Sequence, residues 1–139
     1  MIMIARDRRT QWAAQFAVAA ELCKRGYEVS FTMGNATPLA DLMLVSPKLK
    51  RMFLIDVKGL YRRNPWPIKR KAVRPDLYYV LSFVPDTSAN RFFVMTQEKI
   101  NAYVEQELKR LGRPDNYPMT GITWALAERH ENKWDILPQ

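Results

Sequence analysis

The chain contains one cysteine, Cys23, and one histidine, His130, among 139 residues. A lone cysteine excludes an internal disulfide, and so few thiol and imidazole groups exclude a zinc site of the usual Cys/His kind. Any bound metal must therefore be held by oxygen ligands. We interpret Cys23 as a small buried core residue, and His130 as a solvated residue of a charged surface segment rather than a general base.

Long apolar runs are also missing from the sequence. No stretch approaches the roughly 18 apolar residues of a transmembrane helix, and the charges at 6–9 interrupt the N-terminus before a signal-peptide core can form. We therefore expect a soluble cytoplasmic protein with no membrane partner. An apolar fraction of 47% is too high for intrinsic disorder. Without a linker or a low-complexity tract, residues 1–139 are expected to form a single domain.

The sequence has fewer acidic than basic residues: 14 Asp and Glu against 22 Lys and Arg, which gives a net charge of +8. Such a balance favours an anionic partner. The segment Gly59–Pro75 has no acid at all and contains Arg62, Arg63, Lys69, Arg70, Lys71 and Arg74 with the aromatic residues Tyr61 and Trp66. We expect it to follow a nucleic-acid backbone while its aromatic rings stack on bases. The alternative is a solvated loop that only aids solubility.

Hydrophobic periodicity predicts an α/β arrangement. Apolar residues at Trp12, Phe16, Ala19 and Cys23 indicate an amphipathic helix between residues 8 and 25, ended by a glycine. Five short runs rich in strand-forming residues follow it, at 27–33, 39–45, 52–57, 77–84 and 91–95, with a turn at 34–38 between the first two.

The C-terminal third is expected to be helical at first. Thr96 begins a helix that runs to Leu111, with Gly112 as its terminator. Residues 113–121 are predicted to form a loop because they contain two prolines. The segment 122–137 is either a short helix or extended chain, and we expect Trp124 and Trp134 to anchor it to the core.

Three polar residues in the strand region are the candidates for chemistry. Asp56 and Lys58 point to the same face of their strand because side chains alternate, and both lie at its C-terminal end. Asp41 opens the preceding strand, so adjacent pairing can bring the two carboxylates together. Two carboxylates at such a junction can hold Mg²⁺, and the ammonium can position a water molecule or neutralise a phosphate. The alternatives are a solvated ion pair for Asp56 and Lys58, and a turn residue for Asp41.

The ordered motifs resemble the PD-(D/E)XK nuclease superfamily, particularly its small single-domain members related to archaeal Holliday-junction resolvases. The resemblance covers residues 11–95 and rests on Glu21–Val29, Gly34-Asn35, Asp41-Leu42 and Ile55-Asp56-Val57-Lys58. It implies a restriction-endonuclease-like core with a central mixed five-stranded sheet flanked by helices. It also implies Mg²⁺- or Mn²⁺-dependent hydrolysis of DNA phosphodiester bonds by an enzyme that forms a homodimer.

The resemblance also implies roles for individual residues. Asp41, Asp56 and the backbone carbonyl of Val57 would be metal ligands, and Lys58 would lie beside the attacking water. Family members often carry a glutamate where this chain has Gln15, which brings no negative charge. Because Gln15 lies within the arc of the predicted apolar stripe, we expect it to face the interior and the site.

The missing carboxylate keeps a second interpretation open: a catalytically weakened member of the same fold that acts as a nucleic-acid-binding module. A third interpretation is a basic scaffold that recruits an acidic protein.

Overall fold

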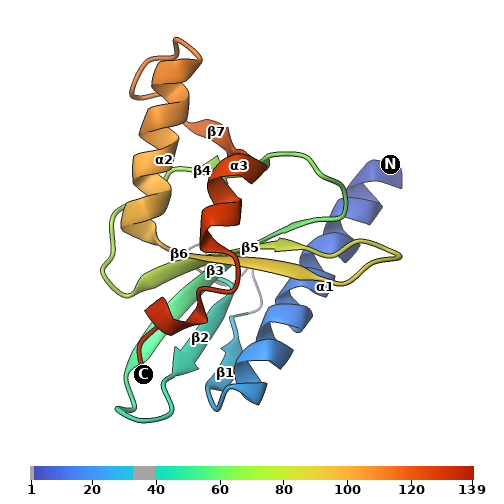
Figure 1. Cartoon of the computed structure of the whole chain (residues 1–139), viewed down its shortest axis with the longest axis vertical. Coiled ribbons are helices and arrows are strands. Elements are labelled where there is room, and N and C mark those ends of the chain that lie inside the picture. Colours follow the sequence, from blue (N-terminus) through green and yellow to red (C-terminus); the bar gives the residue numbers. More distant parts are fainter. Residues whose placement is uncertain (1, 33–39) are drawn as a thin grey trace.

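The computed structural model describes residues 2–32 and 40–139. A mixed five-stranded sheet forms its centre, in the spatial order β1 (Glu28–Phe31), β2 (Leu42–Val45), β3 (Met52–Leu60), β5 (Leu77–Phe83) and β6 (Arg91–Thr96). Strands β3 and β5 are parallel, and the other neighbouring pairs are antiparallel. Figure 1 shows the sheet flanked by helices, which confirms the predicted α/β class. The predicted turn at 34–38 and its Gly34-Asn35 motif lie outside the described residues.

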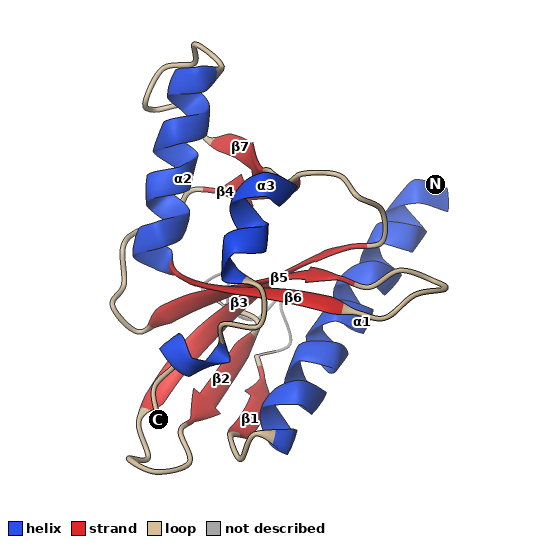
Figure 2. Ribbon diagram, in the orientation of Figure 1, coloured by secondary structure: helices blue, strands red, loops and turns tan. Residues whose placement is uncertain are grey.

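Helices cover both faces of the sheet (Figure 2). Helix α1 (Ile2–Lys24) packs on one face, while α2 (Gln97–Arg110) and the short α3 (Trp124–Ala127) pack on the other. The predicted start of α2 is confirmed, because the Thr96 side chain accepts a hydrogen bond from the Lys99 amide. Within the described part of the chain, no helix is long and apolar enough to cross a membrane.

A small second sheet, absent from the sequence prediction, pairs β4 (Trp66–Lys69) with β7 (Met119–Ile122). It holds the middle of the basic segment against the C-terminal third. After α3 the chain continues in two short 3₁₀ turns, Glu128–His130 and Trp134–Ile136. Trp124 and Trp134 are buried, as expected.

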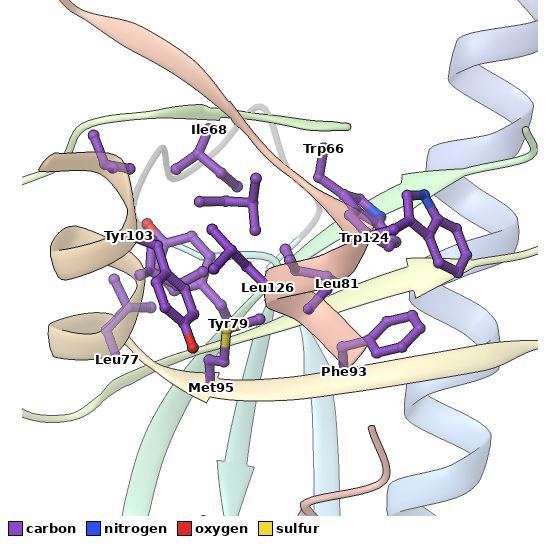
Figure 3. Packing of buried hydrophobic residues seen from close by; sticks show 14 of the residues in the cluster. Trp66, Ile68, Leu77, Tyr79, Leu81, Phe93, Met95, Tyr103, Trp124 and Leu126 are labelled. Carbon is purple, nitrogen blue, oxygen red and sulfur yellow. The ribbon is translucent and has the colours of Figure 1, made fainter. Parts of the chain in front are cut away.

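Two hydrophobic clusters lie on opposite faces of the sheet. The cluster under α2 and α3 centres on Trp66, Tyr79, Phe93 and Trp124, whose positions Figure 3 shows. The cluster under α1 joins Ile55 and Val57 of β3 to Val18 and Leu22 of the helix. The strand continues to Leu60, beyond the predicted end at residue 57, so the placement of Asp56 and Lys58 at its C-terminal end was wrong. Because both faces of β3 are covered, its polar side chains are held in place by surrounding structure.

The buried face of α1 differs from the predicted one. Trp12 is 40% exposed, Phe16 is 59% exposed and Cys23 is exposed, so their assignment to the core was wrong. The helix instead buries a row of smaller residues, among them Ala14. A Cβ added to Gly59 of β3 would lie 2.7 Å from the Ala14 Cβ, so the helix packs too closely on this strand for large rings to fit between them.

Candidate functional site

The pairing of β2 with β3 brings the two predicted carboxylates together. Leu42 pairs with Ile55, so Asp41, one residue before β2, lies opposite Asp56. The Asp41 amide also donates to the Ile55 carbonyl at 3.0 Å. Asp56 is only 2% exposed. The strand order therefore fixes the juxtaposition that the sequence predicts, and it does so at a buried position.

Strand β2 does not continue alongside β3 past Ile55. Side chains therefore form the hydrogen bonds to the backbone of β3 that a neighbouring strand would otherwise form. The Val57 amide donates to Asp41 Oδ2 at 2.7 Å. The Gln11 side chain of α1 donates to the Val57 carbonyl at 2.7 Å and accepts from the Gly59 amide at 3.2 Å. One amide side chain thus makes the pair of bonds that a neighbouring strand would make. This arrangement holds the backbone next to Asp56 and Lys58 in a defined position.

We predict that Gln11→Ala lowers the free energy of unfolding by about 1–3 kcal/mol, because it leaves a partly buried backbone donor and acceptor of β3 without partners. Urea denaturation measures this loss. Gln106→Ala is the matched control, since Gln106 is an exposed glutamine of α2. Equal stability of the Gln11 variant and the control would contradict the structural role of this side chain.

The electrostatic environment of the carboxylates shows how closely they lie together. Burial raises the pKa of Asp41, and the negative charge of Asp56 raises it further, while the backbone bond from Val57 opposes both. Burial also raises the pKa of Tyr79, and the negative charges of Asp56 and Asp41 raise it further. Tyr79 pairs with Asp56 across the parallel β3–β5 register. Burial and neighbouring negative charge thus disfavour the ionised form of both groups, while Lys58 and Lys71 partly offset this effect at Asp41.

Two lysines supply positive charge to Asp56. Lys58 Nζ lies 3.2 Å from Asp56 Oδ1, and Lys71 Nζ contacts Asp56 Oδ2. Lys58 comes from the same strand, as expected. Lys71 comes from the basic segment, and the sequence analysis predicted for it only a role in contacting nucleic acid. The ammonium of Lys58 contacts Oδ1 without the alignment of a hydrogen bond, so this contact is an ion pair.

Gln15 occupies the interior position predicted for it. It is 4% exposed, and its Nε2 donates to Asp41 Oδ1 at 3.3 Å. Its Oε1 is buried without a hydrogen-bond partner within the described part of the chain. Asp56 Oδ1 also accepts no hydrogen bond there, but the Lys58 ammonium lies 3.2 Å from it. A buried oxygen without a donor is costly, and a bound cation would satisfy that of Gln15.

The donor set fits a hard divalent cation. Asp41, Asp56, Gln15 and the Val57 carbonyl offer only oxygen atoms, which Mg²⁺ and Mn²⁺ accept. The set carries just two negative charges, and among residues 2–32 and 40–139 no group of three or more His, Cys, Asp and Glu side chains could hold a metal ion. Water and substrate oxygens would have to complete the coordination.

Several cations of the basic segment already contact other residues of the protein, which its composition alone does not show. Arg63 lies over the Trp124 ring at 3.9 Å, Lys71 contacts Asp56, and Arg74 forms a two-bond pair with Asp76. No ion pair with an acid occurs among the described residues for the remaining three, Arg62, Lys69 and Arg70. These exposed cations are the part of the segment best placed to meet phosphates.

Trp66 is not available to a base. It is 0% exposed, its Nε1 donates to the Ser82 carbonyl at 3.0 Å, and its ring lies 4.8 Å from that of Trp124. Figure 3 shows it within the cluster under α3. This burial contradicts the predicted stacking role. The flanking prolines do make the chain extended, as expected, but β7 covers it.

His130 also differs from its prediction. It is half-buried, and its Nε2 lies 2.7 Å from the Tyr103 hydroxyl. Burial and the nearby Lys99 lower its pKa. It joins α2 to the first 3₁₀ turn and is a packing residue, not a solvated one.

A surface cavity of about 490 Å³ opens beside Lys58. Gln11, Gly59, Tyr61, Arg62 and Asn64 contribute to its wall. Lys58 and Arg62 on its wall suit an anionic group. No sequence pattern singles out Gln11, since a glutamine in a helix has many ordinary roles. The contact between Lys71 and Asp56 was equally hidden, because it depends on the path of an irregular segment.

Comparisons of this chain with protein-family models, curated proteins and solved structures give no significant match.

Proposed function

We propose that this chain is a metal-dependent nuclease with a restriction-endonuclease-like core, which hydrolyses DNA phosphodiester bonds at Asp41, Asp56 and Lys58. Two adjacent carboxylates, Asp56 buried within β3 and Asp41 half-buried just before β2, lie beside two lysines, and this arrangement carries the proposal. A buried Gln15 oxygen without a hydrogen-bond partner among the described residues lies next to them. Burying like charges costs folding free energy, and such costs are concentrated at functional sites. The resemblance to PD-(D/E)XK nucleases supports the same assignment.

The chain's own residues would divide the reaction between them. A water oxygen attacks phosphorus and gives up a proton to solvent, the bond to the leaving oxygen breaks, and that oxygen takes up a proton from solvent. Lys58, held beside Asp56 and lining the cavity, stabilises negative charge that develops on the phosphate. Asp41, Asp56, Gln15 and the Val57 carbonyl would hold Mg²⁺ or Mn²⁺, which lowers the pKa of a bound water and withdraws charge from the phosphate.

The exposed cations of the basic segment would hold the DNA backbone. Arg62 lines the cavity next to Lys58, while Lys69 and Arg70 lie on and just after β4. Contacts of this kind make binding strongly dependent on salt concentration.

We predict that Lys58→Ala reduces cleavage of supercoiled plasmid and of a four-way junction at least about 100-fold with Mg²⁺ or Mn²⁺, because charge on the phosphate loses its nearest ammonium. Product formation on gels measures this loss. Lys48→Ala is the matched control, since Lys48 is exposed in the turn before β3, at the other end of the strand. Equal cleavage by the wild type and the Lys58 variant would refute the assignment of the site.

A second candidate function is a nucleic-acid-binding module without catalysis. The glutamine at position 15 and the two ammonium groups on Asp56 favour it, since both reduce the negative charge available to a metal. Binding of the junction without metal-dependent cleavage would support this candidate. Gln15→Glu would then be the next variant, because it restores a carboxylate at a buried position that already contacts Asp41.

A further inference from the structure

Asp56 is a single buried carboxylate that contacts two ammonium groups. Their side chains are 30% and 22% exposed, for Lys58 and Lys71 respectively, so both reach inward from solvent. With both carboxylates ionised, the formal charges of Asp41, Asp56, Lys58 and Lys71 sum to zero. A divalent cation added to this balanced group would create an excess of two positive charges at short range, which is strongly unfavourable in a partly buried site.

The fold places Lys71 at Asp56 through backbone contacts on both sides of it. The Arg70 amide donates to the Pro118 carbonyl at 3.2 Å, directly after β4. On the other side, the buried Gln97 side chain donates to the Ala72 carbonyl at 3.0 Å and accepts from the Arg74 amide at 2.6 Å. The backbone around Lys71 is therefore fixed, and its ammonium reaches Asp56 as part of the architecture.

Lys71 and Lys58 are not equivalent in this position. Lys58 lies in the central strand on the same face as Asp56, two residues further along, so its attachment point moves only with the sheet. Lys71 reaches Asp56 from a separate layer through its four-carbon stem. Rotation of that stem can carry the ammonium away from Asp56 into solvent without a change in the backbone.

We propose that Lys71 is a built-in competitor for the divalent cation: its ammonium holds Asp56 in the metal-free protein and must leave before a metal binds. This inference rests on the proposed function for the identity of the cation and deepens it by assigning a control residue. It changes the role of Lys71, because an ammonium held by Asp56 is withheld from DNA until metal arrives. Lys69, exposed on the same segment, has no such restraint.

The test measures Mn²⁺ binding by isothermal titration for the wild type, Lys71→Met and the matched Lys69→Met variant. Removal of the competitor should tighten Mn²⁺ binding at least about 5-fold, the lower end of typical coupling between sites. Lys69→Met should remain within about 2-fold of the wild type. An unchanged or weaker Mn²⁺ affinity of the Lys71 variant overturns the proposal, as does an absence of binding to both it and the wild type. Lys71→Gln repeats the measurement if the methionine variant melts at a lower temperature.

A second measurement separates this proposal from a simple DNA contact. In EDTA, Lys71→Met should leave the affinity for a DNA duplex within about 2-fold, whereas Lys69→Met should weaken it. Equal weakening by both substitutions, with unchanged Mn²⁺ affinity, would make Lys71 an ordinary phosphate contact and overturn the proposal. If the Lys58 cleavage test fails, the Mn²⁺ titration still decides the role of Lys71, so the two failures are distinguishable.

Discussion

Asp41→Asn is expected to abolish metal-dependent cleavage while leaving the metal-free protein at least as stable as the wild type. Cleavage should fall at least about 100-fold, because one of two charged ligands is lost. Asparagine keeps an oxygen that accepts from the Val57 amide and a group that can pair with Gln15. It also removes a charge that burial and Asp56 disfavour. Plasmid cleavage and urea denaturation in EDTA measure the two effects.

The sign of the pH dependence follows from the raised pKa of Asp41. The folded protein favours the neutral carboxyl, so the free energy of unfolding is highest below the pH at which an unfolded aspartate ionises. It falls as the pH rises through the raised pKa of the folded state. The asparagine variant lacks this fall, so its advantage should grow over that interval. A variant less stable than the wild type at neutral pH would show that Asp41 serves the fold instead of the site.

Trp66→Ala is expected to lower the free energy of unfolding by about 3–5 kcal/mol, the usual cost of removing a large aromatic side chain from a core. Its ring contacts those of Phe93 and Trp124, and its Nε1 bonds to the Ser82 carbonyl. Urea denaturation followed by circular dichroism measures the loss. The matched control is Trp12→Ala, because Trp12 is 40% exposed on α1.

The comparison between the two tryptophans distinguishes a structural role from a binding role. If Trp66 stacked on nucleic acid, its removal would weaken DNA binding and leave stability close to that of the Trp12 variant. Because Trp66 is buried and Trp12 is exposed, we expect Trp66→Ala to lower the free energy of unfolding much more than Trp12→Ala does. A loss below about 1 kcal/mol for Trp66→Ala would contradict its place at the centre of the cluster.

The sheet could be predicted from the sequence because strand periodicity is local. In β3, Ile55 and Val57 alternate with Asp56 and Lys58, and this alternation fixes which side chains share a face. Turn residues then separate one strand from the next along the chain, whereas no local pattern marks the parallel pairing of β3 with β5. The approach of Asp41 to Asp56 follows from antiparallel pairing across a short turn, so the centre of the candidate site was also accessible.

Other features depend on partners that are distant in sequence. The buried face of α1 could not be recognised from apolar spacing, because close packing at Gly59 selects small residues such as Ala14 over Trp12 and Phe16. Trp66 looked exposed among charges and prolines, since its cover comes from β7 and Trp124 more than fifty residues later. No local pattern reports such a contact. The same holds for Lys71, whose position depends on the path of a segment without regular structure.

The pairing of β4 with β7 means that the basic segment becomes part of a sheet late in the synthesis of the chain. A ribosome releases the N-terminal part of a chain first, and early parts can begin to fold before later ones appear. All five strands of the main sheet lie before residue 97, whereas β4 gains its partner only when residues 119–122 have emerged. A growing chain therefore passes through a stage in which the two aspartates can already meet while Trp66 is still uncovered. The segment that carries Lys71 therefore gains its pairing to β7 only after all five strands of the main sheet have been made.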